Sequence, residues 1–326
     1  EQVFVERHLV DIAYSILRDS PNFYSIFETF NYLAIKPLIS EETLKGNYAC
    51  IFHDTSFDSN HCALIPRLYK NILAKRPARA ILSHARFTYV HAEEMRKNLL
   101  KTLGFATSSI EAKRVRVLPY GSPHPNTVNL LDFQESRLRL GLSLNENVIL
   151  VFGTVRSDKN YDLLLRGVAE VPNWHMVFAG PEGDHSYTDV KKLGDDLQIG
   201  DRMTIYDQFV TSDVQALFFG AADVVACLYK DGVRHESGTA QRARTFLKPI
   251  IVSGTPDLTS YVQNEHVGWV ADPALPSVLG KILAEISAMT RQQVHELRRS
   301  IYCCAVRRSW DHVAELIIKQ ASNYSS

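Results

Sequence analysis

The stretch Val148-Ile149-Leu150-Val151-Phe152-Gly153-Thr154-Val155-Arg156-Ser157-Asp158-Lys159-Asn160 determines how this chain is organised. Its apolar run predicts a buried strand that ends at Gly153, and the spacing that follows predicts a helix from Tyr161 to Val168. A second turn, Gly232-Val233-Arg234-His235-Glu236-Ser237-Gly238-Thr239, precedes another predicted helix. Two such turns at the carboxyl ends of parallel strands can face one pocket and hold an anionic ligand with backbone N–H groups and cations.

Length and composition bound the class of protein. The 326 residues suggest about two domains, and 45% hydrophobic with 22% charged residues is typical of globular proteins. Lysine plus arginine and aspartate plus glutamate balance at 36 each, which gives no reason to expect a nucleic-acid partner. Five cysteines without a CxxC spacing predict reduced thiols, and no apolar run reaches the length of a membrane span. We therefore expect a cytoplasmic protein.

The first part of the chain mixes predicted helices with short predicted strands. Residues 1–48 favour helix and include an aromatic-rich segment from Phe23 to Tyr32. Beyond them we predict strands at Tyr48–Phe52, Ala80–Ser83 and Val115–Gly121, the last ending in a turn, and helices at Leu64–Lys75 and about 92–103, the latter closed by Gly104. Two prolines within Ser122–Asn129 indicate a linker.

A regular alternation of strands and helices follows this linker. We predict strands at Val148–Phe152, His175–Ala179, Met203–Tyr206, Val224–Leu228, Ile250–Ser253 and Gly268–Val270. Helices are predicted between them, for example at Asp189–Leu197, Asp213–Gly220 and Ala240–Phe246, and nearly all of Pro276–Ser322 favours helix. Short apolar strands separated by helices predict an α/β fold with a parallel sheet that is covered on both faces.

Six short segments follow one another in a recognisable order across residues 45–318. They are Ile51–Asp54; Ala80–Ser83 with Ala92–Met95; Val115–Gly121; Phe152-Gly153 with Lys159; Gln208–Val210 with Ala221–Val224; and Ser237–Thr239 with Lys248–Ile251. In this order they resemble the glycosyltransferases of the GT-B fold, in particular the family-4-like group that uses nucleotide-sugar donors. Each segment is unspecific by itself, and their order carries the resemblance.

The resemblance implies two Rossmann-like domains with parallel sheets flanked by helices. Residues 1–125 would form the acceptor-side domain, residues 126–308 the donor domain, and residues 309–326 a helix that returns to the first domain. That family normally opens with a strand and a glycine-rich loop, and no such loop precedes residue 45. We therefore expect the acceptor-side domain to be compact or incomplete.

The donor's diphosphate is expected at the two turns. The resemblance assigns it to Gly153, Lys159 and the Ser237-Gly238-Thr239 turn, with Arg156 as a further cation near the glycine. A helix N-terminus suits a diphosphate because its free N–H groups and its dipole favour negative charge. Two other interpretations stay open, namely that Ser237 or Thr239 is only a helix cap and that the cations belong to a solvated helix turn. Phe209 and Val210 would edge the base pocket.

Two arginines replace residues that the family usually has as glutamates. Counting back from Pro249, Arg234 and Arg242 stand at the positions of that pair. They can grip a phosphate or an acidic sugar, or they can belong to a surface helix face. Glu236 is the alternative sugar-facing carboxylate. Because the second glutamate of the pair usually holds the donor ribose, these substitutions leave the donor and the stereochemistry open.

His53 and Asp54 are the candidate catalytic pair. His53 ends a predicted strand and resembles the active-site histidine of the family, and Asp54 can orient it. A structural histidine is the alternative. Asp58 and His61 lie close by in the sequence, but their spacing is unspecific and no DxD motif stands in the donor half. We therefore expect no metal and no cofactor besides the nucleotide-sugar substrate.

The resulting hypothesis is a glycosyltransferase that moves a sugar from a nucleotide-diphosphate donor to a hydroxyl acceptor, as in polysaccharide biosynthesis. The acceptor would be a glycan, a lipid-linked molecule or a small molecule. We expect retention through same-face attack, with inversion by His53 as base left open. The alternative is a non-catalytic nucleotide-sugar-binding or partner subunit. A nicotinamide-dependent dehydrogenase is disfavoured because residues 152–156 lack the GxGxxG spacing.

A basic segment gives a further hypothesis about location. Residues 59–92 contain no acid, and residues 64–86 combine an apolar stripe with several lysines and arginines. Such a segment can touch an anionic membrane surface or a lipid-linked phosphate, which would make the protein peripheral at the inner membrane face. A solvated helix face is the alternative.

Overall fold

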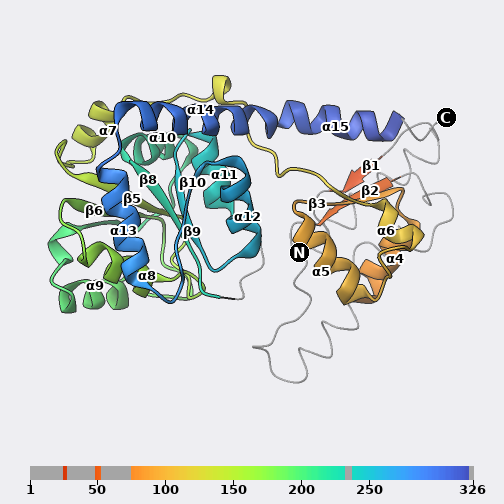
Figure 1. Cartoon of the computed structure of the whole chain (residues 1–326), viewed down its shortest axis with the longest axis horizontal. Helices are drawn as coiled ribbons and strands as arrows, with labels where there is room; N and C mark the ends of the chain where they lie inside the picture. The colour runs from red at the N-terminus through yellow and green to blue at the C-terminus, as the bar shows by residue number, and fades with distance from the viewer. Residues whose placement is uncertain (1–24, 28–47, 53–74, 232–236, 323–326) are drawn as a thin grey trace. The chain divides into compact units, whose positions relative to one another are not determined.

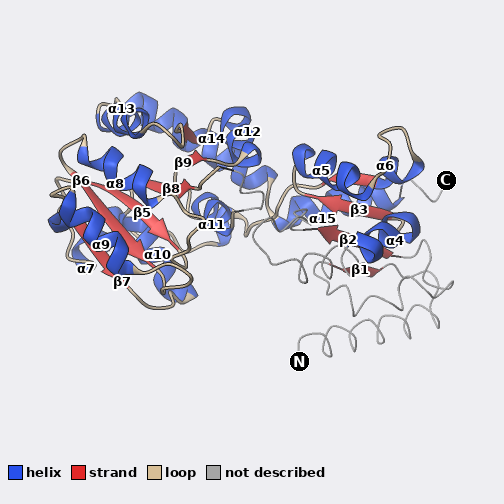
Figure 2. Ribbon diagram, turned by 90° about the horizontal axis from the view of Figure 1, so that it is seen from below, coloured by secondary structure: helices blue, strands red, loops and turns tan. Residues whose placement is uncertain are grey.

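The computed structural model describes residues 25–27, 48–52, 75–231 and 237–322 (Figure 1). These residues group into two compact units, one ending at Pro119 and one beginning at Tyr120. Both units are built from parallel strands that pack against helices, as Figure 2 shows by colour. The predicted division into residues 1–125, 126–308 and 309–326 stays a prediction.

The first unit contains a four-stranded parallel sheet. Its strands run in the order β1 (Ser25–Phe27), β2 (Tyr48–Phe52), β3 (Phe87–Val90) and β4 (Val115–Val117). The helices described here are α4 (Arg76–His84), α5 (Glu93–Leu103) and α6 (Ile110–Arg114). A core of apolar side chains from β2, α4 and α5 joins sheet and helices. Gly104 ends α5 with a φ of 72°, as predicted from its position.

The predicted strand Ala80–Ser83 is wrong, because these residues lie inside α4. Ala78, Ile81 and Leu82 are the buried residues of this helix, so the apolar spacing is that of one helix face. The strand of this region is β3, formed by the apolar run that follows α4 in the chain. Part of the stretch 1–48 that favoured helix also differs, because Ser25–Phe27 forms β1. The predicted helix Leu64–Lys75 lies almost entirely outside the described residues.

The second unit contains a six-stranded parallel sheet in the order β10-β9-β8-β5-β6-β7. The strands are β5 (Asn147–Phe152), β6 (Trp174–Ala179), β7 (Met203–Tyr206), β8 (Val224–Leu228), β9 (Ile250–Ser253) and β10 (Gly268–Val270). The six predicted strands are confirmed to within one residue at each end. From β5 the chain moves outward through β6 and β7, then crosses to β8 and moves outward on the other side.

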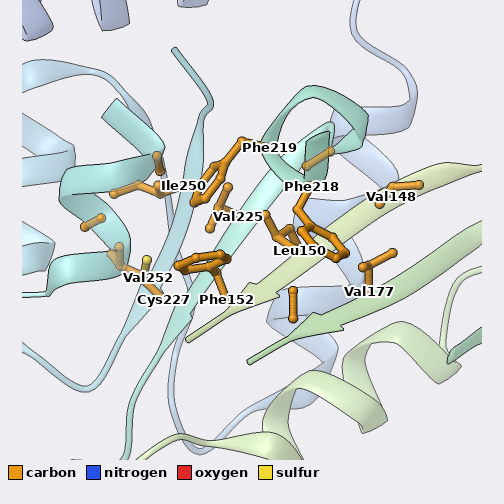
Figure 3. Close-up of a cluster of buried hydrophobic side chains, with 14 of the residues drawn as sticks. Val148, Leu150, Phe152, Val177, Phe218, Phe219, Val225, Cys227, Ile250 and Val252 are labelled. Carbon is orange, nitrogen blue, oxygen red and sulfur yellow. The ribbon is translucent and has the colours of Figure 1, made fainter. Parts of the chain in front are cut away.

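Helices cover both faces of this sheet, as its apolar strands predict. One face packs against α10 (Ser212–Ala221), α11 (Gly238–Thr245), α12 (Pro256–Glu265) and α14 (Arg291–Arg307). The other face packs against α8 (Tyr161–Ala169), α9 (Tyr187–Asp196) and α13 (Pro276–Ser287). Figure 3 shows the first core, where Phe152 of β5 lies near Cys227 of β8 and Phe219 lies over Val225.

The remaining elements connect or close the second unit. The predicted linker Ser122–Asn129 contains one short 3₁₀ turn, η3 (Pro125–Thr127); α7 (Phe133–Arg139) follows, and η4 (Gly200–Arg202) precedes β7. The predicted helical end is confirmed, since α13, α14 and α15 (Trp310–Ser322) fill it. The backbone N–H of Trp310 donates to the carbonyl oxygen of Ser122 at 2.9 Å. Among the described helices, none combines the length and the hydropathy that crossing a membrane requires.

Candidate functional site

The candidate site lies in the second unit where the strand order reverses. β5 lies between β8 and β6, so the chain leaves β5 toward one side and returns to β8 on the other. In open parallel sheets, ligands bind outside the carboxyl ends of the strands at such a switch point. Gly153 follows β5 directly, and Tyr229 follows β8. The two sequence turns therefore leave neighbouring strands, as predicted.

The first turn of α11 provides two unpaired backbone donors. Ser237 is the N-cap, and its Oγ accepts the N–H of Ala240 at 3.2 Å. The N–H groups of Gly238 and Thr239 have no hydrogen-bond partner among the described residues. The interpretation of Ser237 as a cap is thus confirmed, and it is compatible with an anion site, because capping uses a different N–H group.

Lys159 reaches back to the end of β5. Its Nζ donates to the carbonyl oxygens of Phe152 at 3.0 Å and Gly153 at 3.3 Å. The hydroxyl of Thr239 donates to the same Phe152 oxygen at 3.2 Å, so the lysine and the first turn of α11 meet at one atom. Burial lowers the pKa of Lys159 to about 8. No described carboxylate forms an ion pair with Lys159. A bound anion would therefore stabilise its protonated form and raise its pKa again.

Gly153 and Gly180 let the backbone come close at the ends of β5 and β6. Gly153 has a φ of 85°, a left-handed conformation that glycine adopts without strain. A Cβ added to Gly180 would lie 2.5 Å from the carbonyl carbon and oxygen of Gly153. The loops after these two strands therefore approach each other closely, and their contact forms the wall of the site on the β6 side.

Arg156 is engaged within its own loop. Its Nε donates to Oδ1 of Asp158 at 3.0 Å, and its Nη2 pairs with Oδ2 of the same carboxylate. The pKa of Arg156 is raised because of this hydrogen bond. Ser157 is also fixed, since its N–H and its hydroxyl donate to Asp184 at 2.9 and 2.7 Å. Two of the three guanidinium nitrogens of Arg156 are therefore bound to Asp158.

The two residues predicted for the base pocket differ in exposure. Phe209 is 78% exposed, whereas Val210 is 5% exposed and packs in the core beside Phe218 and Phe152. Gln215 of α10 donates to the carbonyl oxygen of Val210 at 3.5 Å, a long hydrogen bond. Phe209 is therefore the member of the pair whose side chain is open to a ligand.

Arg242 lies one turn beyond Ser237 on α11. Its Nε donates to Oε1 of Gln215 at 3.2 Å, and its Nη1 donates to the carbonyl oxygen of Gly238 at 3.3 Å. Its guanidinium lies 5.7 Å from the centre of the Phe152 ring. Arg244 is buried instead and holds the carbonyl oxygen of Tyr120 at 2.7 Å. The structure thus brings together Gly153, Lys159, Ser237, Gly238, Thr239 and Arg242.

Four predicted site residues lie outside the described residues: His53, Asp54, Arg234 and Glu236. Their assignment stays a prediction. Among the residues that the structure describes, no group of three histidine, cysteine, aspartate or glutamate side chains could hold a metal ion.

Tyr229 and Gln215 belong to this site although the sequence did not indicate them. The hydroxyl of Tyr229 hydrogen-bonds Oγ of Ser237 at 2.9 Å, and the Tyr229 side chain is 4% exposed. An aromatic residue directly after a buried strand was a weak signal for Tyr229. Gln215 had none, because its role depends on the packing of α10 against α11.

Residues 132–301, just over half of the chain, match the family described as glycosyl transferases group 1. The D-inositol 3-phosphate glycosyltransferase of Mycobacterium ulcerans (strain Agy99) is 32% identical over 129 residues, which cover 38% of this chain and 28% of that protein. Its counterpart in Mycobacterium leprae (strain Br4923) is 28% identical over 197 residues, covering 57% and 44%. The matched region spans less than half the length of these curated relatives.

Two solved structures have the same fold over nearly the whole chain. Sucrose-phosphate synthase of Thermosynechococcus elongatus superposes with a TM-score of 0.71 at 16% identity, covering 97% of this chain and 77% of that one. Anabaena HepE in complex with UDP superposes with a TM-score of 0.74 at 14% identity, covering 96% and 81%. These likenesses confirm the predicted α/β fold with Rossmann-like domains. The match of residues 132–301 to its model establishes that the chain belongs to the glycosyl transferases group 1 family.

Proposed function

We propose that the chain transfers a sugar from a nucleoside-diphosphate sugar to a hydroxyl group of an acceptor. One observation carries the proposal: Lys159 and the first turn of α11 converge on the carbonyl oxygen of Phe152 at the switch point. A partly buried ammonium and two N–H groups without a partner among the described residues suit a ligand with adjacent negative charges. The family and the UDP bound to HepE support a nucleoside diphosphate as that ligand.

The chemistry follows from the position of these charges. As the bond between the sugar's anomeric carbon and the diphosphate oxygen breaks, negative charge grows on the diphosphate, and Lys159 with the N–H groups of Gly238 and Thr239 would stabilise it. The acceptor oxygen bonds to the anomeric carbon. For retention, its proton passes to the departing diphosphate oxygen on the same face. For inversion, His53 would take the proton as base, oriented by Asp54.

The remaining predicted residues receive roles within the same proposal. Phe209 and Val210 would edge the nucleobase, with the exposed ring of Phe209 as the stacking surface. Arg156 would join the diphosphate by exchanging Asp158 for the ligand. Arg234 and Glu236 would face the transferred sugar. The charge of the diphosphate would be met by these cations without a metal ion.

The acceptor belongs to the proposal as well. The curated relatives are named for an inositol phosphate acceptor, which supports a hydroxyl compound that carries phosphate, whether small or lipid-linked. Arg76 and Arg79 on α4 are exposed and could meet such a phosphate or an anionic membrane. Sedimentation with phosphatidylserine vesicles tests the membrane part. Wild-type binding that Arg76→Glu with Arg79→Glu abolishes supports it, and wild type left in the supernatant contradicts it.

A thermal-shift panel tests the donor site first. Wild type, Lys159→Met and Lys248→Met are heated with UDP, GDP, dTDP, ADP and CDP and with their common sugar conjugates. We expect one diphosphate to raise the Tm of wild type and of Lys248→Met by several degrees but not that of Lys159→Met. If EDTA abolished the rise in Tm, the proposal that the diphosphate binds without a metal ion would be contradicted. A folded wild type that no nucleotide stabilises would contradict the whole proposal.

Transfer assays then separate an enzyme from a binding subunit. With the donor identified, product formation is followed with inositol phosphates and with glycan and lipid-linked acceptors. Release of nucleoside diphosphate together with a glycosylated product supports the enzyme. A donor that binds and is never transferred supports the non-catalytic alternative.

A further inference from the structure

A cavity of about 350 Å³ lies at the amino ends of β8 and β9, where residues from α7, α10, α14 and the end of α11 meet. A volume of this size is typical of small-molecule pockets. Ala222 precedes β8 and Tyr229 follows it, so the five residues of β8, roughly 16 Å of strand, separate this amino-end cavity from the candidate site. Its walls are mainly apolar, formed by Leu130, Leu131, Phe133, Ala216, Phe246 and Leu247.

The aromatic walls of the amino-end cavity are held in place by their neighbours. The ring of Phe246 stacks on that of Phe219 with 4.7 Å between the ring centres. The guanidinium of the buried Arg137 lies 4.1 Å from the centre of the Phe133 ring. Neither ring can turn into the cavity without losing such a contact, so the space is pre-formed.

Leu247 lines the cavity from a strained backbone conformation. It follows the last turn of α11 with a φ of 54°, and the N–H groups of Leu247 and Lys248 donate to the carbonyl oxygens of Arg244 and Ala243 at 3.1 and 2.8 Å. This is the hydrogen-bond pattern of a helix end whose left-handed residue is usually glycine. A leucine there costs backbone free energy that glycine would not, and it adds an apolar side chain to the cavity wall.

Two cations line the same cavity without a carboxylate partner among the described residues. Nζ of Lys248 donates to the carbonyl oxygens of Gly220 and Ala222, which leaves one of its three N–H groups. Arg298 of α14 is exposed and forms no hydrogen bond or ion pair within the described part of the chain. The two charges are near each other, since the positive charge of Arg298 adds to burial in lowering the pKa of Lys248.

The remaining polar groups around the cavity limit the charge of its ligand. Asp132 is the one carboxylate in the lining, and its Oδ1 accepts the N–H groups of Gln134 and Glu135 at 2.8 and 3.1 Å. The carboxyl ends of α10 and α11 also lie here, and their partial negative charges oppose a multiply charged anion. One spare ammonium N–H and one guanidinium match the two oxygens of a single carboxylate.

We propose that the amino-end cavity binds a small amphipathic monocarboxylate. Its carboxylate lies between Lys248 and Arg298, and its apolar or aromatic body packs against the leucine and phenylalanine walls. A cavity of 150 Å³ holds benzene, so the larger space here suits a body with a short chain, about twelve non-hydrogen atoms in all. This ligand is distinct from the nucleotide, and the inference does not rest on the proposed function.

Calorimetric titration of wild type with 4-phenylbutyrate tests the inference. 4-Phenylbutan-1-ol and 4-phenylbutylamine are the neutral and cationic matches of the same shape. We expect a dissociation constant of about 0.1–1 mM for the carboxylate and at least fivefold weaker binding of both other compounds. Absence of binding, or equal binding of all three compounds, would overturn the inference.

Variants of the two cations locate the bound carboxylate. Arg298→Glu and Lys248→Met should each weaken binding of 4-phenylbutyrate at least tenfold. Arg299→Glu is the matched control, because Arg299 is the exposed neighbour on α14 and does not line the cavity, and it should bind as wild type within about twofold. Equal affinities in Arg298→Glu and Arg299→Glu would overturn the inference, and this comparison stands even if Lys248→Met does not fold.

A competition experiment separates this cavity from the donor site. The titration with 4-phenylbutyrate is repeated at a saturating concentration of the diphosphate that binds best, and the dissociation constant should stay within about twofold. Displacement of the carboxylate by the nucleotide would place it in the donor site and overturn the inference. If no nucleotide binds, the proposed function fails, while the titrations of wild type and the variants still decide whether the cavity binds a carboxylate.

Discussion

Lys159 and Phe152 are joined by a hydrogen bond of 3.0 Å from the ammonium to the carbonyl oxygen at the end of β5. A second lysine makes the same kind of contact at the amino ends of the strands. Nζ of Lys248, two residues before β9, donates to the carbonyl oxygens of Gly220 at 3.2 Å and Ala222 at 2.9 Å. Burial lowers the pKa of both lysines to about 8. The two lysines differ in position, because only Lys159 lies at the point where the strand order reverses.

Replacing Lys159 by methionine should weaken nucleotide binding without unfolding the protein. A buried ammonium costs desolvation free energy, and methionine fills a similar volume, so the Tm without nucleotide should stay the same or rise. Loss of a charge-assisted contact should weaken diphosphate binding by about 2–3 kcal/mol, roughly 30- to 150-fold. Calorimetry and thermal unfolding measure the two effects. Equal weakening in Lys248→Met would mean that Lys159 acts only through stability.

Diphosphate affinity should fall as the pH rises through about 8. Below that pH Lys159 carries its proton, and above it the free protein loses the proton, because burial has lowered the pKa. A bound diphosphate favours the charged form, so binding at higher pH requires proton uptake and weakens by up to about tenfold per pH unit. Titrations from pH 7 to 9.5 should show this slope in wild type and in Lys248→Met. Lys159→Arg, which stays charged, should flatten it; a slope retained there would exclude Lys159 as its cause.

The sequence predicted the second unit well because its strands are buried on both faces. Runs such as Val148–Phe152 are apolar throughout, and a parallel sheet is the arrangement that covers such strands. The same criterion failed at Ala80–Ser83, where a short apolar run belongs to α4. Four residues cannot distinguish a strand from one face of a helix, and Pro77 in the first turn was the better signal.

The candidate site was predictable where its residues belong to the two turns that precede predicted helices. Gly153, Lys159 and the Ser237 turn were found from those turns and from the order of segments that carries the family resemblance. The pairing of Arg156 with Asp158 depends on loop geometry that the sequence does not contain. The link between Gln215 and Arg242 joins residues 27 positions apart on two helices, so only the packing of those helices brings it about.

Tyr229→Phe should weaken diphosphate binding more than its cost in stability explains. The hydroxyl of Tyr229 fixes Oγ of Ser237, which caps the turn that offers its N–H groups to the ligand. Losing it should cost about 1 kcal/mol of stability and weaken binding by roughly three- to tenfold as the turn loosens. Tyr302→Phe is the control, because its hydroxyl donates to Oδ1 of Asn126 at 3.1 Å and does not touch the loops after β5, β6 and β8. Similar binding losses in both variants would contradict a positioning role for Tyr229.

Gly180→Ala should destabilise the protein through a steric clash at the wall of the site, beyond the backbone strain that any residue with a Cβ would bring. Its added Cβ would lie 2.5 Å from the Gly153 carbonyl group, so the two loops must move apart. Gly141 also has a positive φ, 68°, but nothing lies within 4 Å of an added Cβ there. Gly141→Ala should therefore cost only the conformational strain of about 1–2 kcal/mol, and Gly180→Ala should cost more and also weaken nucleotide binding. Urea unfolding and calorimetry compare the two, and equal costs would mean that the close approach is unimportant.

Asp223→Ala should be among the most destabilising substitutions in the second unit. Arg137 is 1% exposed, and its Nη2 donates to Oδ2 of Asp223 at 2.6 Å, which links α7 to the start of β8. The same oxygen accepts the N–H of Val148 at the start of β5. Removing the carboxylate leaves a buried guanidinium without its counter-charge, and breaking a buried pair in this way typically costs about 3–5 kcal/mol.

The exposed pair on the same helix provides the control for Asp223→Ala. Arg139 and Glu135 of α7 are each 56% exposed and 3.5 Å apart. Solvent screening reduces such a pair to about 0.5 kcal/mol or less, so Glu135→Ala should barely change the midpoint of urea unfolding. Nucleotide binding should survive in folded Asp223→Ala, because the pair lies at the amino ends of β5 and β8, away from Lys159. A midpoint for Asp223→Ala that matches Glu135→Ala would show that water or another carboxylate replaces Asp223 beside Arg137.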